Sequence, residues 1–182
     1  ITLETELTND NIIYGNGNAS VYNSCNLTGS NIGIYTSNDV PQNVDSTLIR
    51  KSGKYNYANR HITWTIDVNK SETPIQDVKI LDGILSGQEF LKDTFKVIRQ
   101  SGNTDDTSIT TNVGSKLIYT PKDSLELEKG GDLVYDFGNI SDCYQITFDT
   151  QIPNDNEFDE NKDKVVTNEA NLTTSETSKE IK

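Results

Sequence analysis

The sequence predicts an all-β fold, an antiparallel sandwich of two sheets, on three observations. Asn, Ser and Thr make up 56 of the 182 residues, a composition that favours strands and polar turns over helices. Apolar and polar residues alternate with a period of two in many short segments, as they do in half-buried strands. Turn-forming sequences separate these segments at the spacing typical of sandwiches.

The clearest strand is His61–Asn69, because Ile62, Trp64, Ile66 and Val68 share one face and polar residues occupy the other. The same alternation predicts eleven further strands. They are Ile1–Leu7, Asn11–Tyr14, Ala19–Leu27, Thr47–Lys51, Val78–Leu85, Phe95–Arg99, Lys116–Thr120, Ser124–Leu127, Leu133–Phe137, Cys143–Thr150 and Val165–Leu172.

One segment, Ser86–Lys92, is expected to form a short helical turn. We expect residues 1–173 to form a single domain and residues 174–182 to be a linker to a following domain. The chain has no run of about 18 apolar residues, so no membrane span is expected. It also has no Met, and we expect an excised piece of a longer secreted or surface chain. Any signal peptide or cell-wall anchor would then lie outside it.

The charge balance argues against an anionic partner. Sixteen Lys and Arg face 28 Asp and Glu, giving a formal net charge of −12. Neither nucleic acid nor an anionic membrane surface is therefore expected as a partner. One acidic stretch lacks the Gly and closing Glu of an EF-hand loop, so we expect a solvated loop and no calcium site. Its members are Asp155, Glu157, Asp159, Glu160 and Asp163.

Cys25 and Cys143 are the only cysteines, and His61 is the only histidine. That inventory cannot build a zinc site of four Cys, or of two Cys and two His, and we predict no metal site. Cys25 and Cys143 could form a disulfide in an oxidising compartment; two free thiols are the alternative, because the sequence gives no distance between them. His61 is expected at an exposed strand start, without a catalytic role.

Three polar residues fall on apolar strand faces. Asp82 alternates in register with Val78, Ile80 and Ile84, and Asn168 with Val166, Ala170 and Leu172. Lys51 shares a face with Ile49, although Leu48 makes the opposite face apolar too. Each of these groups is unfavourable when buried alone, so the pattern raises the hypothesis that the three meet.

If the three meet, they can react. Burial raises the pKa of an Asp and lowers that of a Lys, so that the Lys51 amine becomes a neutral nucleophile. A protonated Asp82 can then polarise the Asn168 carbonyl and help the amide nitrogen leave. The product is a Lys51–Asn168 isopeptide bond, formed once, with loss of one ammonia and no cofactor. The alternative interpretation is a solvated Lys, a turn Asp and an Asn that satisfies backbone groups.

The ordered segments around these residues resemble the ligand-binding domain of Gram-positive collagen adhesins. They are K51-S-G-K-Y, H61-I-T-W-T-I-D-V-N69, V78-K-I-L-D82-G-I-L-S-G-Q88, Y144-Q-I-T-F-D-T150 and V166-T-N168-E-A-N-L172. The resemblance implies an Ig-like sandwich, the adhesin variant of the Ig fold, on a bacterial cell surface. It also implies that Lys51 is joined to Asn168 with help from Asp82; Lys54 is the second candidate amine.

The resemblance further implies a host extracellular-matrix ligand of the collagen class, bound in a shallow trench on one sheet. The outward residues expected there are charged or small, which argues against collagen itself: Arg50, Thr65, Asp67 and Lys96. Four tyrosines could instead supply a recognition surface or simply pack at the sandwich edge: Tyr22, Tyr35, Tyr55 and Tyr57. No ligand-binding residue is assigned.

Competing function classes remain at this stage. A stalk or spacer module with no ligand of its own is the main alternative to an adhesin. A carbohydrate-binding sandwich would need clustered planar aromatics, whereas the only Trp, Trp64, is expected to face inward. A turnover enzyme is not expected, because self-cross-linking is the only chemistry that the sequence indicates.

Overall fold

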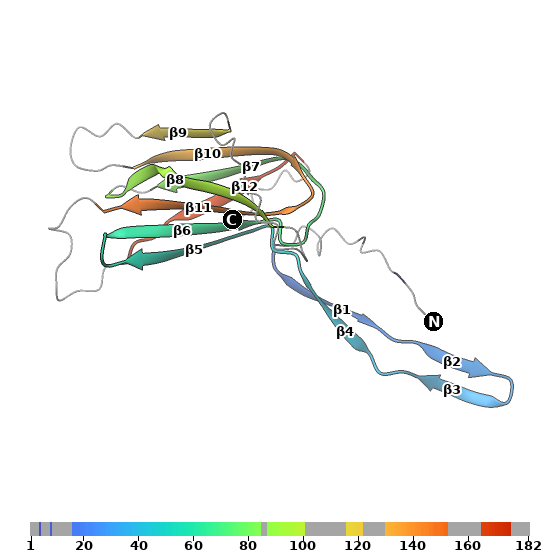
Figure 1. Cartoon of the computed structure of the whole chain (residues 1–182). Helices are drawn as coiled ribbons and strands as arrows, with labels where there is room; N and C mark the ends of the chain where they lie inside the picture. The colour runs from blue at the N-terminus through green and yellow to red at the C-terminus, as the bar shows by residue number, and fades with distance from the viewer. Residues whose placement is uncertain are drawn as a thin grey trace.

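The computed structural model describes residues 4, 8, 16–84, 87–100, 116–121, 130–152 and 165–175. This part of the chain contains strands and no helix (Figure 1). The strands are β1 (Asn18–Asn23), β2 (Asn26–Gly29), β3 (Ile32–Thr36), β4 (Val40–Asp45), β5 (Ile49–Asn56), β6 (His61–Val68), β7 (Ile75–Ile84), β8 (Glu89–Gln100), β9 (Leu117–Pro121), β10 (Gly131–Ile140), β11 (Cys143–Gln151) and β12 (Glu169–Thr173).

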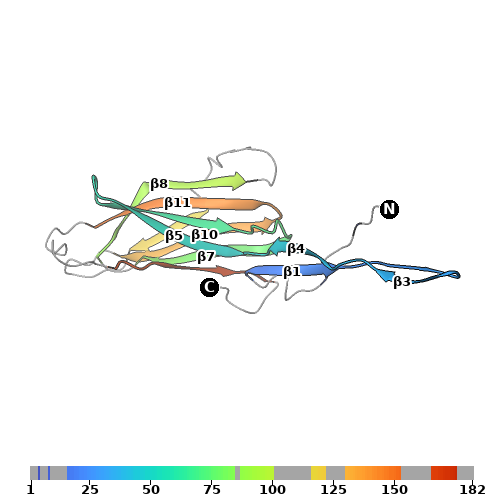
Figure 2. The same cartoon turned by 90° about the horizontal axis from the view of Figure 1, so that it is seen from below.

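Two four-stranded antiparallel sheets pack face to face in the Ig-like sandwich that the sequence predicts (Figures 1 and 2). One sheet has the order β5-β6-β11-β8, and the other has the order β12-β7-β10-β9. The chain crosses between the sheets after β6, β7, β8, β10 and β11, so strands far apart in sequence become neighbours. Strands β5 and β12 are edge strands of different sheets and contact each other.

The core lies between the inner faces of the two sheets, where the alternation places the apolar residues. In β7 the four residues Val78, Ile80, Asp82 and Ile84 are all buried, as predicted. In β6 the Trp64 side chain faces inward, also as predicted. The apolar pattern therefore fixes which face of each strand is buried, and it carries Asp82 inside with its neighbours.

A second part of the described chain is a two-stranded ribbon, residues 18–45, that projects from one end of the sandwich (Figure 1). Strand β1 pairs with β4 near the sandwich, and β2 pairs with β3 at the far end. The Asn16 side chain ties its base to the sandwich, since Asn16 Oδ1 accepts hydrogen bonds from the Leu48 and Ile49 amides at 2.9 and 3.0 Å.

Several predicted elements need correction. The prediction of a helical turn at Ser86–Lys92 is wrong. Strand β8 begins at Glu89, because Glu89, Phe90 and Leu91 pair with β11. Strands β3 and β4 were not predicted, since their exposed residues show no buried face. Strand β12 begins at Glu169, within the predicted Val165–Leu172.

Three predicted strands lie wholly or mainly outside the described residues: Ile1–Leu7, Asn11–Tyr14 and Ser124–Leu127. The acidic stretch between Asp155 and Asp163 lies outside them as well. The domain boundary at residue 173 stays a prediction.

Candidate functional site, a buried lysine–aspartate–asparagine cluster

Lys51 is an interior lysine on β5. It pairs in register with Ile66 of β6, and its side chain is 9% exposed. Its amine lies over two aromatic rings, with Nζ 5.0 Å from the centre of Trp64 and 5.5 Å from that of Phe148. These rings exclude water from the amine while offering it their electron-rich faces.

Gly53 makes room for this arrangement. It lies opposite Trp64 in the register, and a Cβ atom at this position would come within 2.5 Å of the Trp64 ring. No side chain larger than that of Gly therefore fits beneath the indole that covers the Lys51 amine. Shielding of the Lys51 amine by Trp64, with room left by Gly53, was not predicted. Trp64 alternates with the inward residues of β6, and Gly53 alternates with Lys51 along β5.

Asp82 comes from the opposite sheet. It lies on β7 between Leu133 of β10 and Ala170 of β12, and its side chain is fully buried. Asp82 Oδ2 is hydrogen-bonded and ion-paired to Lys51 Nζ, whereas Oδ1 has no hydrogen-bond partner. The pair therefore bridges the two sheets inside the sandwich.

Asn168 is the third member and directly precedes β12. Both polar atoms of its side chain, Oδ1 and Nδ2, are buried without a hydrogen-bond partner. The Asn168 side chain lies near the Asp82 carboxyl and slightly opposes the rise in its pKa, although no hydrogen bond of good geometry joins the two groups. An unsatisfied buried carboxamide is unfavourable and calls for an explanation. Lys51, Asp82 and Asn168 are hereafter the interior cluster.

Burial sets the protonation of the interior cluster. It raises the pKa of Asp82, against the opposing charge and hydrogen bond of Lys51. It also lowers the pKa of the Lys51 amine, against the opposing charge of Asp82. Both shifts favour proton transfer from the ammonium to the carboxylate, because desolvation penalises each charged form. The cluster can thus hold a neutral amine beside a protonated acid and a carboxamide.

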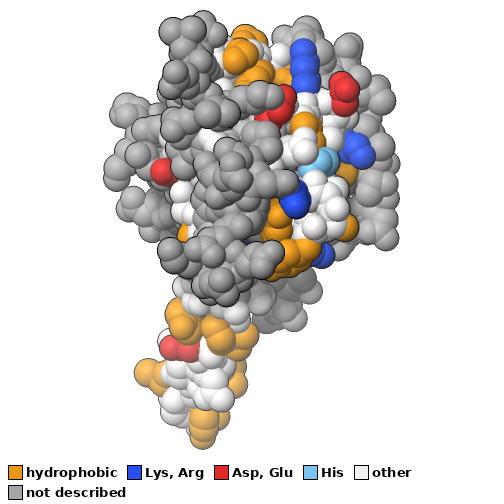
Figure 3. Space-filling model, turned by 90° about the vertical axis from the view of Figure 1, so that its left-hand side faces the viewer, with side chains coloured by type: hydrophobic (Ala, Val, Ile, Leu, Met, Phe, Trp, Pro, Cys, Tyr) orange, Lys and Arg blue, Asp and Glu red, His pale blue; other side chains and the backbone are white. Residues whose placement is uncertain are grey.

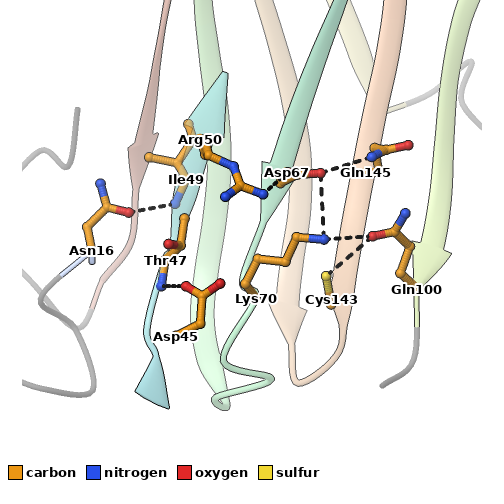
Figure 4. A network of polar contacts seen from close by, with 10 residues as sticks. All are labelled: Asn16, Asp45, Thr47, Ile49, Arg50, Asp67, Lys70, Gln100, Cys143 and Gln145. Carbon is orange, nitrogen blue, oxygen red and sulfur yellow. Dashed lines mark hydrogen bonds and ion pairs between the residues drawn. The ribbon is translucent and has the colours of Figure 1, made fainter. Parts of the chain in front are cut away.

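A second Lys–Asp–carboxamide group lies at the sandwich surface (Figure 4). Lys70 Nζ is 3.0 Å from Gln100 Oε1 and 3.7 Å from Asp67 Oδ1. Asp67 also accepts hydrogen bonds from Arg50 and Gln145 at 2.8 and 2.9 Å. Burial alone would raise the pKa of Asp67, but these two hydrogen bonds and the positive charges of Lys70 and Arg50 together outweigh it and lower the pKa. Lys70, Asp67 and Gln100 are hereafter the surface cluster.

The proposed disulfide is absent: Cys25 and Cys143 are both free thiols. Cys25 is exposed on the ribbon between β1 and β2, whereas Cys143 is buried at the start of β11 in the sandwich. Their separation between two parts of the structure explains why they do not pair. Lys54, the second candidate amine, is exposed on β5, so only Lys51 enters the core.

Other predicted candidates lie away from the interior cluster. His61 begins β6, as predicted, with Nδ1 3.7 Å from Asp149 Oδ2. Tyr22, Tyr35 and Tyr57 are exposed, and Tyr55 packs edge-on against Tyr57. Across the described residues, no group of three His, Cys, Asp or Glu side chains is arranged to hold a metal ion. No helix in the described ranges is long and apolar enough to span a membrane.

The two packed sheets define this chain as an Ig-like β-sandwich domain. Residues 46–182 match the family described as "Collagen binding domain", and the chain belongs to this family. The match begins at the base of the ribbon and includes every member of both clusters. The resemblance drawn from the sequence is thereby confirmed at the level of the family.

Several solved structures are similar to this chain at low sequence identity. The collagen-binding domain of a Staphylococcus aureus adhesin is 15% identical at a TM-score of 0.45, covering 74% of this chain and 90% of that one. The collagen-binding subdomain of the Enterococcus faecalis surface protein ACE is 11% identical at 0.46, covering 74% and 91%.

The collagen-binding domain of the Erysipelothrix rhusiopathiae surface protein RspB is 12% identical at a TM-score of 0.45. The alignment covers 86% of this chain and 49% of that one, so this chain spans about half of its length. No curated protein sequence matches this chain significantly.

Proposed function

We propose that this domain is the ligand-binding part of a bacterial cell-surface adhesin, locked by an isopeptide bond between Lys51 and Asn168. Membership of the collagen-binding domain family supports the adhesin role over a stalk module without a ligand. The ligand would be a host extracellular-matrix protein of the collagen class. The domain would lie outside the cell, anchored to the cell wall through a part of the protein beyond this chain.

The observation that carries the cross-link is the unpartnered Asn168 amide beside the buried Lys51–Asp82 pair. Proton transfer within the pair gives a neutral amine, whose nitrogen attacks the Asn168 side-chain carbon. The new C–N bond replaces the bond to Nδ2, which leaves as ammonia carrying a proton relayed by Asp82. The reaction consumes its own side chains, so it occurs once and is not enzymatic turnover.

The cross-link would have a mechanical role. It joins residue 51 to residue 168, a separation of 117 residues, and it ties the edge strand β5 to the segment before β12. Tension along a surface protein would therefore meet a covalent bond between the two sheets. By the chain-entropy argument a link of this length stabilises by about 5 kcal/mol.

Intact mass measures the cross-link directly. The reduced chain should weigh less than its sequence by one ammonia, and a protease digest should yield a branched peptide containing Lys51 and Asn168. Asp82→Ala should restore the full mass. A reduced wild-type chain of unmodified mass would overturn the cross-link without affecting the adhesin assignment.

Ligand binding needs a separate test on the outer face of the β5-β6-β11-β8 sheet. Thr65 lies there between Ser52 and Thr147, in a row of small hydroxyl side chains. We expect saturable binding to one member of a panel of matrix proteins that includes triple-helical collagen. Thr65→Trp should weaken it about tenfold or more by filling this row, whereas Thr120→Trp, on β9 of the other sheet, should not. Absence of binding to the whole panel would favour the stalk function.

A further inference from the structure

The ribbon formed by residues 18–45 exposes an unusual share of apolar surface. Six of the nine large hydrophobic side chains that are exposed in the described part of the chain lie on it. They are Tyr22 (63%), Leu27 (61%), Ile32 (49%), Ile34 (74%), Tyr35 (64%) and Val40 (64%). Figure 3 shows hydrophobic side chains gathered on this projection below the body of the sandwich. Grouped exposed apolar residues mark interaction sites, whereas scattered ones are ordinary.

The ribbon lacks a layer to pack against. Leu27 and Tyr35 are directly opposite each other in the β2–β3 register, so they share one face, while Ile34 belongs to the other. Among the described residues no third strand joins β1–β4 or β2–β3. An isolated two-stranded ribbon is only marginally stable in water, so apolar residues on both faces indicate that something covers them.

The two long edges of the ribbon differ. The edge formed by β1 and β2, Asn18–Gly29, contains no proline and no charged residue. The edge formed by β3 and β4 includes Pro41 and Asp45, with Asp39 between the strands. Proline and charge are the usual protection of an edge strand against pairing with another chain. The β1–β2 edge is therefore the one open to a further strand.

Charge does not oppose a second copy of this chain at this edge. Asp39 and Asp45 are the only charged residues between 16 and 45, in a chain whose net charge is −12. Two copies of this chain repel each other over the acidic sandwich but not at the ribbon. An antiparallel edge can also pair with its own copy across a two-fold axis, because such a contact is self-complementary.

We propose that two copies of this chain associate through their ribbons, with the β1–β2 edge of one pairing antiparallel to the same edge of the other. The paired edges form a four-stranded sheet whose exposed apolar residues lie beside those of the partner copy. The proposal concerns assembly of the chain and rests neither on the isopeptide bond nor on the matrix ligand.

The geometry predicts a cross-linking pattern. A two-fold axis normal to the sheet keeps opposed residues on one face, so the register is centred on a residue. If residues 19–29 pair about Ser24, Cys25 of one copy lies opposite Asn23 of the other. The two Cys25 residues then share a face and are about 7 Å apart along the strands, two residues along the paired edges. Cys25 is exposed whereas Cys143 is buried, so a short bismaleimide should link two chains through Cys25. Moving the thiol to the other edge, in the double variant Cys25→Ser and Asp39→Cys, should abolish linking.

Sedimentation equilibrium of the whole chain measures the association itself. The wild type should dimerise reversibly, and Leu27→Lys should raise the dimer dissociation constant about tenfold or more by placing like charges at the contact. Ile118→Lys is the matched control, because Ile118 is equally exposed at 61% but lies on β9 of the sandwich. It should leave the constant unchanged. Unreactive Cys143 in each variant would show that the sandwich has folded.

Three outcomes would overturn the proposal: a monomeric wild type at all concentrations, a dimer insensitive to Leu27→Lys, or linking through Asp39→Cys but not through Cys25. Ribbon-dependent binding of a matrix protein by a monomeric chain would assign the surface to that partner instead. Should Leu27→Lys fail to fold, linking through Cys25 in the wild type decides the matter alone.

Discussion

The interior and surface clusters contain the same three functional groups and differ in their environment. In each, a lysine amine pairs with an aspartate, and a side-chain carboxamide contacts one member of that pair. The Asp82 side chain is fully buried and that of Lys51 is 9% exposed, whereas Asp67 and Lys70 are 12% and 24% exposed. Among the described residues Asp82 pairs with Lys51 alone, while Asp67 pairs with both Lys70 and Arg50.

The two environments shift the pKa values of Asp82 and Asp67 in opposite directions. Burial raises the pKa of Asp82, but hydrogen bonds and nearby positive charges lower the pKa of Asp67 despite its burial. The interior pair is driven towards a neutral acid and amine, whereas the Asp67 side chain of the surface cluster is held as a carboxylate. We therefore expect that proximity of a lysine to a carboxamide is not sufficient for reaction. We infer that exclusion of water separates a cross-linking site from an ordinary ion-pair network.

The largest expected effect follows from removing the reactive carboxamide. Asn168→Ala should prevent the cross-link and lower the free energy of unfolding by about 5 kcal/mol. In a chain of this size the melting temperature should fall by roughly 10–20 °C. Gln100→Ala removes the carboxamide of the surface cluster and should change neither the intact mass nor the melting temperature by a comparable amount. Equal effects of the two variants in calorimetry would contradict the comparison.

A smaller effect is expected when the shield over the Lys51 amine is disturbed. Gly53→Ala places a Cβ atom 2.5 Å from the Trp64 ring, which must move away from Lys51. Such overpacking costs about 1–3 kcal/mol, and water then reaches the amine and slows the reaction. Mass spectrometry of freshly folded protein should show an unreacted fraction.

Gly83→Ala is the matched control, because a Cβ atom there meets nothing within 4 Å although Gly83 adjoins Asp82. The Gly83→Ala chain should form the Lys51–Asn168 bond completely. Complete reaction of Gly53→Ala as well, with an unchanged melting temperature, would show that the Trp64 shield is unnecessary.

The smallest effect concerns the surface cluster and its pH dependence. Because the folded pKa of Asp67 lies below its ordinary value of 3.8, its ionised form adds stability above that pH. This contribution is lost as the pH falls through the folded pKa. Asp67→Asn should therefore lower the free energy of unfolding by about 1 kcal/mol or less near neutral pH, and the deficit should shrink on acidification.

Denaturant unfolding above and below pH 3.8 measures this deficit. Ile118→Asn, which changes an exposed side chain that does not titrate, is the control and should show no such convergence with the wild type. A deficit for Asp67→Asn that grew in acid would contradict the assigned direction of the pKa shift.

The sequence predicted the sandwich and the burial of Asp82 because alternation is a local property of each strand. It also placed Trp64 inside and drew attention to Lys51 and Asn168 as polar residues on apolar faces. It failed at Ser86–Lys92, where pairing with β11 overrides local preference, and at β3 and β4, whose residues carry no buried face. Gly53 escaped notice because its role depends on which residue of β6 lies opposite.

The sequence alone therefore determined the fold class and indicated the inward direction of the Lys51, Asp82 and Asn168 side chains, since both follow from the period of two along a strand. Only the tertiary structure decided that Lys51 and Asp82 meet across the sheets, that Cys25 and Cys143 do not pair, and that residues 18–45 leave the sandwich. These depend on contacts between segments far apart in the chain. Pairing between strands and the exclusion of water set such contacts, and no local pattern encodes them.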